Sequence, residues 1–210
     1  MIAAGGLSGG LSSTIAGGKF IDGFRQGVIT SGLNHVAHMF LEKQTIKGVL
    51  KRLNLKGEEK APQTYASLQL LLSDPAMNSQ YVWAGSPTIG DGRQMSISSL
   101  DNVRTNGETA AATTDTFGNG NIVMYGDSFK NWETLGFNMV HELQHRFQWS
   151  MGYIDRWMKK FDYNMNVVWN MAEYEAHRTV LSWGYQPKPG VLYLSPYSGV
   201  VNSYYPNTIK

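Results

Sequence analysis

The chain has no cysteine among its 210 residues. This absence excludes a disulfide framework, a cysteine nucleophile and a zinc site built from thiolates. Any zinc that the protein binds must be held by histidine and carboxylate side chains, which suits a catalytic site better than a structural one.

Long apolar runs and a strong excess of one charge are also missing. No stretch approaches the roughly 20 apolar residues of a bilayer span, and the N-terminus lacks the basic and continuous apolar regions of a signal peptide. The net charge is only +2, and lysines cluster only between residues 43 and 60. Such a basic run is typical of a solvated helix and loop, so we expect no nucleic-acid partner and no membrane span.

The most informative pattern present is His-Glu-x-x-His at residues 141 to 145. On a helix of 3.6 residues per turn, His141 and His145 lie about 40° apart around the axis and about 6 Å apart along it. Both imidazoles can therefore reach one metal ion. Glu142 lies between them, where its carboxylate can take a proton from a water activated by that metal. The pattern predicts a hydrolase with Glu142 as the general base.

The flanking sequence predicts that this motif lies on a helix. Asn131 is a helix cap, Glu133 falls in the first turn, and Gly152 is a stop signal. Apolar residues recur through the motif at helical spacing: Trp132, Leu135, Met139, Val140, Leu143 and Phe147. The two histidines flank this stripe and should be partly buried, where a metal would satisfy them. The alternative is a surface helix whose histidines and glutamate make only polar contacts with one another.

A catalytic zinc requires three protein ligands and one open position, so a second ligand-bearing element is expected. Residues 167 to 183 predict a further helix. Within it Glu173 and His177 are four residues apart and face the same way, whereas Glu175 points to a different side. The alternative for the two glutamates is a solvated charge pair beside Arg178.

The sequence HELQH, followed by a helix that contains Glu-x-x-Ala, resembles the gluzincins, the zincin metallopeptidases whose third zinc ligand is a glutamate. The resemblance implies an α+β zincin-like fold and one Zn²⁺ per chain, bound by His141, His145 and Glu173, with Glu175 as the fallback ligand. It also implies that His177 supports the site or takes part in catalysis, although the family more often has a carboxylate or amide there. The implied activity is that of a zinc endopeptidase, in which Glu142 activates the water that attacks a peptide carbonyl.

A short apolar run between Gly120 and Gly126 predicts a strand just before the motif helix. Zincins carry an edge strand at this place, and a peptide substrate binds against it by strand addition. The resemblance therefore implies four substrate-binding residues: Ile122, Val123, Met124 and Tyr125. An ordinary core strand is the alternative.

The first forty residues differ in composition from the rest, with nine glycines between Gly5 and Gly32. The stretch from Gly9 to His35 resembles the junction that follows the core of Rhs-repeat polymorphic toxins. This resemblance implies a leader at residues 1–40 and a zincin-like peptidase domain at residues 41–210. It also implies a toxin that is secreted or delivered into a target cell within a larger protein, with a protein or peptide substrate and a cognate immunity protein. His35 and His38 belong to this leader and are not expected to bind the metal.

The rest of the chain predicts short elements that complete an α+β fold. They are helices at residues 45–55 and 63–72, strands at 81–83, 95–97 and 191–194, and an exposed loop or lid at 102–119. A donor to the oxyanion of the reaction is expected, for which Tyr174, Tyr204 and Tyr205 are candidates besides His177.

Two other functions fit the same residues. A hydrolase on the same scaffold could cut cell-wall peptides. A protein that is not an enzyme could instead keep the motif helix as structure, or be a non-catalytic, metal-stabilised binding module whose leader docks to a partner.

Overall fold

The computed structural model describes residues 44–100, 102–103 and 109–187. The predicted leader at residues 1–40, with His35 and His38, lies outside this part of the chain. So do the predicted strand at 191–194 and the two tail tyrosines, Tyr204 and Tyr205. The described residues form an α+β fold, as predicted, with six α-helices, one short 3-10 helix and two small sheets.

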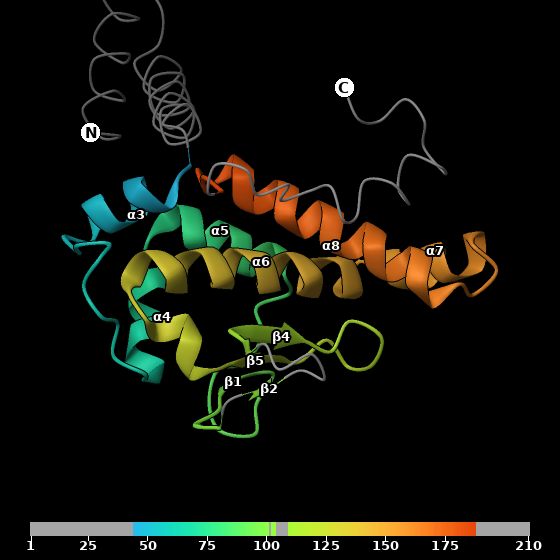
Figure 1. Ribbon diagram of the computed structural model, residues 1–210, viewed down its shortest axis with the longest axis horizontal. Helices are drawn as coiled ribbons and strands as arrows, with labels where there is room; N and C mark the ends of the chain where they lie inside the picture. The colour runs from blue at the N-terminus through green and yellow to red at the C-terminus, as the bar shows by residue number, and fades with distance from the viewer. Residues whose placement is uncertain (1–43, 101, 104–108, 188–210) are drawn as a thin grey trace, which may run out of the picture. The chain divides into compact units, whose positions relative to one another are not determined.

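Helix α6 (Trp132–Ser150) is central to the fold and carries the HExxH motif. It packs against α3 (Ile46–Arg52), α5 (Pro75–Trp83) and α8 (Met165–Ser182), and against strands of the larger sheet. Figure 1 shows α6 between α8 and these strands. The motif therefore lies where two helices and a sheet meet.

The ends of α6 follow from local sequence, as predicted. The side chain of Asn131 caps the first turn by accepting a hydrogen bond of 2.7 Å from the backbone N–H of Thr134. Glu133 lies in the first turn, where the helix dipole favours a negative charge. Gly152, with a φ of +65°, follows the last turn and redirects the chain into α7 (Tyr153–Lys160). The predicted apolar stripe of α6 faces the core, with Leu135, Met139, Val140 and Leu143 fully buried.

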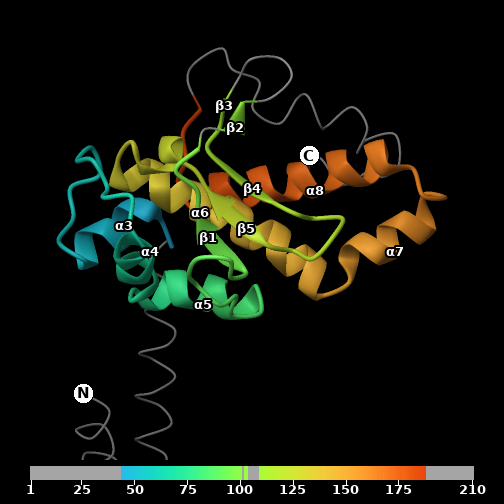
Figure 2. The same ribbon diagram turned by 90° about the horizontal axis from the view of Figure 1, so that it is seen from below.

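The larger sheet has three strands in the order β1 (Met95–Ile97), β5 (Ile122–Met124) and β4 (Ala112–Thr114). Strand β5 is parallel to β1 and antiparallel to β4. The prediction of an edge strand just before the motif helix is therefore wrong, because β5 has a hydrogen-bonded partner on each side. Among the described residues, β1 and β4 are the two outer strands of this sheet, and β4 has no further strand paired to its outer side (Figure 2).

The predicted loop at residues 102–119 is wrong where the structure forms three short strands in it. It contains β2 (Asn102–Val103) and β3 (Thr109–Ala110), which pair with each other, and also β4. These strands are only two or three residues long and contain threonine, alanine and asparagine more than large apolar residues. Tertiary pairing forms them, and no hydrophobic alternation in the sequence predicts them.

The predicted strand at residues 81–83 is also wrong, since these residues form the last turn of α5. The side chain of Asp74 caps that helix by accepting a hydrogen bond of 2.9 Å from the backbone N–H of Ala76. Pro75 occupies the first turn, where its missing N–H costs no hydrogen bond. The Asp-Pro pair that ends the preceding helix thus also starts the next one.

The other predicted elements are confirmed. They are α3, α4 (Tyr65–Leu72), β1, β5 and α8, which begins two residues earlier than predicted because Asn164 caps it. Helix α7 was not predicted; it packs against α8 in a separate apolar cluster that includes Ile154, Trp157 and Val168. None of the described helices combines the length and the hydropathy that crossing a bilayer requires.

Candidate metal centre

A cleft of about 1150 Å³ opens beside the HExxH motif. It is lined by one face of α6, by residues 111–117 in and next to β4, and by one face of α8. His141, Glu142 and His145 contribute from α6, and Glu173 and His177 from α8. The structure thus brings these five of the predicted site residues to one cavity.

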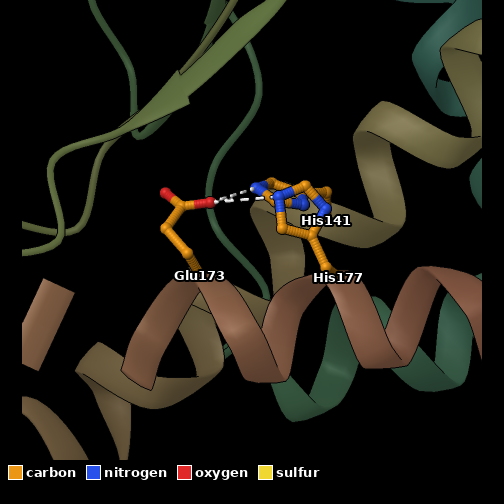
Figure 3. Close-up of side chains that lie close together, drawn as sticks. All are labelled: His141, Glu173 and His177. Atoms are coloured by element: carbon orange, nitrogen blue, oxygen red, sulfur yellow. Dashed lines mark ion pairs between the residues drawn. The ribbon is translucent and has the colours of Figure 1, made fainter. Parts of the chain in front are cut away.

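Three of these side chains converge on one point. The Nε2 atoms of His141 and His145 lie 3.1 Å apart. The carboxylate of Glu173 spans both nitrogens: its Oε2 lies 3.4 Å from Nε2 of His141, and its Oε1 lies 3.4 Å from Nε2 of His145. Figure 3 shows Glu173 on α8 directed at the imidazole of His141.

These separations match the donors of a single metal ion. Ligand atoms about 2.0–2.1 Å from a tetrahedral ion lie about 3.3 Å from one another. The 3.1 Å distance between the two nitrogens and the 3.4 Å distance from each nitrogen to its own carboxylate oxygen are close to that value. Two imidazole nitrogens and a carboxylate can therefore hold a metal ion here and leave further positions open toward the cleft.

His177 lies at the margin of this group. Ligand atoms of His141, Glu173 and His177 all lie within 4.8 Å of one another, so His177 is a possible further ligand. Its Nε2 is 3.6 Å from Glu173, and its ring centroid is 4.8 Å from that of His141. Because His145 lies closer to both His141 and Glu173, His145 completes the tighter set of three.

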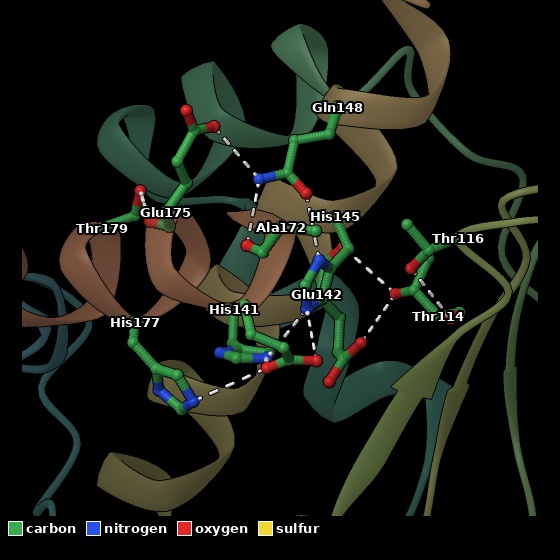
Figure 4. Close-up of polar contacts among 11 residues, drawn as sticks. Thr114, Thr116, His141, Glu142, His145, Gln148, Ala172, Glu175, His177 and Thr179 are labelled. Carbon is green, nitrogen blue, oxygen red and sulfur yellow. Dashed lines mark hydrogen bonds and ion pairs between the residues drawn. The ribbon is translucent and has the colours of Figure 1, made fainter. Parts of the chain in front are cut away.

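The fallback ligand, Glu175, faces away from the cluster. Its Oε2 accepts a hydrogen bond of 3.2 Å from Nε2 of Gln148 on α6 (Figure 4). Burial raises the pKa of this carboxyl, and the hydrogen bond from Gln148 only partly offsets the effect. As the helical spacing predicted, Glu173 and Glu175 face different sides of α8, and only Glu173 faces the two histidines of α6.

The electrostatics of the cluster couple Glu173 to the histidines. Burial opposes ionisation of Glu173, but hydrogen bonds from His141 and His145 outweigh it and hold the pKa of this carboxyl well below its usual range. For His145, burial disfavours the charged imidazole, and the neighbouring Glu173 more than compensates, so its pKa is raised. Burial and the nearby His141 lower the pKa of His177 to about 4. Glu173 is therefore ionised and His177 neutral at neutral pH.

Glu142 is held by a residue that the sequence did not reveal. The hydroxyl of Thr114 donates a hydrogen bond of 2.6 Å to its carboxylate (Figure 4). Thr114 is the last residue of β4, and Glu142 is only 5% exposed. The general-base candidate therefore lies between the metal-binding cluster and the open strand.

The predicted substrate strand does not reach the cleft. Ile122 and Met124 are fully buried. Val123 and Tyr125 are not among the described residues that line the cleft. Residues 111–114, in and next to β4, line it instead. Because β5 pairs on both sides, it is the central strand of the sheet. The edge strand next to the cleft is β4, and not β5 as predicted.

The oxyanion candidate Tyr174 also lies away from the cleft. It is 5% exposed, packs in the apolar cluster between α7 and α8, and has the guanidinium of Arg178 over its ring at 5.8 Å. Of the predicted oxyanion donors in the described part of the chain, His177 is the one at the cleft.

No family model matches the chain, and comparisons with curated proteins and with solved structures find no match.

Proposed function

We propose that this protein is a zinc-dependent endopeptidase of the gluzincin kind. The observation that supports it most is the spacing of the His141, His145 and Glu173 donors around one point, with the carboxylate of Glu142 held beside them. Imidazole and carboxylate ligands with an open position are typical of catalytic zinc.

The residues of the site divide the chemistry among them. His141, His145 and Glu173 would hold the zinc ion. When bound, zinc supplies positive charge that makes a water more acidic and stabilises negative charge on a carbonyl oxygen. Glu142 accepts the proton of the attacking water and passes it to the leaving amine. Thr114 orients the Glu142 carboxylate by its 2.6 Å hydrogen bond.

His177 is the proposed donor to the carbonyl oxygen of the substrate. It lines the cleft, and a pKa near 4 keeps its imidazole neutral at neutral pH. A neutral imidazole can still donate one N–H hydrogen bond to a developing oxyanion.

Strand β4 is the proposed binding edge for an extended peptide. Ala111 accepts a backbone hydrogen bond from Tyr125, and Asp115 donates one to Asn121. Hydrogen-bonded residues alternate along an antiparallel strand, so the backbone groups of Thr113, midway between them, point toward Val123 on β5. The backbone N–H and C=O groups of Ala112 and Thr114 then point away from β5. A peptide can add to this edge as a further strand, which is a common mode of peptide recognition.

The implied biology is that of a toxin delivered within a larger protein. This part of the proposal depends on the resemblance of the leader to the Rhs junction, and the leader lies outside the described residues. Expression of the chain inside a sensitive cell should arrest growth, and Glu142→Gln should abolish the effect.

The peptidase proposal is tested with the purified full chain, loaded with zinc and incubated with a denatured protein substrate, a peptide library and cell-wall peptides. Mass spectrometry of the products should reveal new peptide termini for the wild type and none for Glu142→Gln, which should still bind zinc. Glu59→Gln is the matched control, because Glu59 is 55% exposed and pairs only with Lys56 on the surface. Wild-type rates from Glu142→Gln would contradict the role of the base, and cleavage of cell-wall peptides alone would change the substrate class.

A further inference from the structure

We propose that Gln148 is a positioning residue that fixes the tautomer of His145, so that Nε2 of His145 is ready to bind a metal before any metal arrives. Gln148 lies three residues after His145 on α6, and none of its surface is exposed. Its side chain contacts His145 on one side and α8 on the other (Figure 4).

The orientation of the Gln148 amide follows from its partners on α8. Its Nε2 lies 3.2 Å from the backbone carbonyl oxygen of Ala172 and 3.2 Å from Oε2 of Glu175. A backbone carbonyl oxygen can only accept a hydrogen bond, whatever the protonation state of the neighbouring Glu175 carboxyl. The NH₂ group of Gln148 must therefore face α8, because the flipped amide would set its own oxygen against these two oxygens.

The tautomer of His145 follows from that orientation. With its NH₂ group committed to α8, Gln148 presents Oε1 to Nδ1 of His145 at 3.1 Å. An amide oxygen can only accept, so Nδ1 must carry the proton. The proton that the ring shares with Glu173 on Nε2 is then the one lost when the imidazole becomes neutral, and this loss leaves the lone pair on Nε2, the atom that faces His141 and Glu173. Metal ligation by histidine requires such a lone pair, and the hydrogen bond on the other nitrogen selects it.

The same amide links the two helices that carry the ligands. Ala172 and Glu175 flank Glu173 along α8, so two hydrogen bonds from Gln148 on α6 hold the segment that presents the third ligand. A buried side chain that joins His145 to this segment should keep Glu173 at its 3.4 Å separation. Its effect on metal affinity rests on the proposed metal site, whereas its effect on the tautomer does not.

The tautomer is tested on the full chain without metal. Long-range ¹H–¹⁵N NMR of the histidine rings distinguishes a proton on Nδ1 from one on Nε2, and it is recorded at a pH high enough that the His145 signals no longer change with pH. We expect His145 to carry the proton on Nδ1 in the metal-free wild type. A proton on Nε2 of His145 in the wild type would overturn the proposal, whatever the peptidase assay gives.

The role of Gln148 is tested with Gln148→Met, which keeps the side-chain length but removes both ends of the amide. We expect a mixture of tautomers at His145 and a zinc Kd that rises about 10- to 100-fold, the usual result of losing a partner of a metal-binding histidine. Gln144→Met is the matched control on the same helix, because Gln144 contacts Gln80 at 3.4 Å instead of His145. An unchanged tautomer in folded Gln148→Met would overturn the proposal. If that variant fails to fold, the wild-type measurement still decides.

Discussion

The hydroxyl of Thr114, at the end of the edge strand β4, donates a 2.6 Å hydrogen bond to the carboxylate of Glu142 in the HExxH motif. This contact joins the strand that we propose binds substrate to the residue that we propose acts as base. A peptide bound along β4 would thus lie next to a carboxylate whose orientation the same strand controls.

Thr114→Val should remove this orientation while preserving the shape of the side chain. A hydrogen bond to a charged group contributes about 1.5–3 kcal/mol, so we expect kcat to fall about 10- to 100-fold with zinc content unchanged. The control is Thr179→Val on α8, where the hydroxyl bonds only to the backbone oxygen of Glu175. Steady-state peptide hydrolysis measures both. Equal kcat values for the two variants would show that Thr114 does not orient the base.

The assignment of the third ligand predicts opposite results for two nearby glutamates. Glu173→Ala should lose most of its zinc affinity, because it removes a carboxylate that places one oxygen 3.4 Å from each histidine. Glu175→Ala should retain zinc, since Glu175 faces Gln148. Competition with a zinc-binding dye measures both affinities. Retained affinity in Glu173→Ala together with loss in Glu175→Ala would reverse the assignment.

Protons should compete with the metal at His145. Burial alone would lower the pKa of this imidazole, but Glu173 raises it, so His145 gains its proton at a higher pH than an ordinary histidine. Glu173 stays ionised and His177 neutral until the pH is much lower. Zinc affinity should therefore fall as the pH drops through the raised pKa of His145. Equilibrium dialysis at a series of pH values tests this, and affinity that stays constant down to about pH 4 would contradict it.

The metal-free protein should show the opposite dependence in its stability. A raised pKa in the folded state means that protonated His145 stabilises the fold, and this contribution is fully present below the unfolded pKa. It is lost as the pH rises through the folded pKa. Adding zinc should reverse the trend, because only the neutral imidazole binds the metal. Thermal unfolding with and without zinc over the same pH range measures both trends; parallel curves would count against a metal at His145.

Two aromatic side chains in the cleft predict a preference for substrates with a large apolar residue near the cleaved bond. Phe117, after β4, is 40% exposed, and Trp169, one turn before Glu173 on α8, is 42% exposed. Trp169→Ala should lower kcat/KM for such peptides about tenfold, because the apolar side chain of the bound peptide would no longer bury its surface against the indole ring. Met165→Ala is the control, because Met165 lies one turn before Trp169 on α8 and outside the cleft lining. Equal rates for apolar and polar peptides in the wild type would rule the preference out.

Local sequence accounts for the parts of the site that were predicted. The cap at Asn131, the apolar stripe of α6 and the four-residue spacings within each helix all act within about two dozen residues, so periodicity and capping chemistry define them. Those rules place His141 and His145 on one face and separate Glu173 from Glu175. The family resemblance, and not the local sequence, predicts that the two helices bring their ligands together.

The parts that were missed depend on contacts between distant segments. Thr114 meets Glu142 across 28 residues of sequence, and Gln148 meets Ala172 across 24. A lone threonine or glutamine carries no signal of such a partner. The exchange of β4 for β5 as the edge has the same origin, because the order of strands in a sheet is a property of tertiary pairing.

The central claim is that His141, His145 and Glu173 hold one zinc ion, and zinc content tests it most directly. Inductively coupled plasma mass spectrometry on the full chain, folded in excess zinc and then dialysed, should give about one zinc per chain. The double variant His141→Ala, His145→Ala should give close to none. A folded wild-type protein without zinc, or a double variant that retains a full equivalent, would contradict the account.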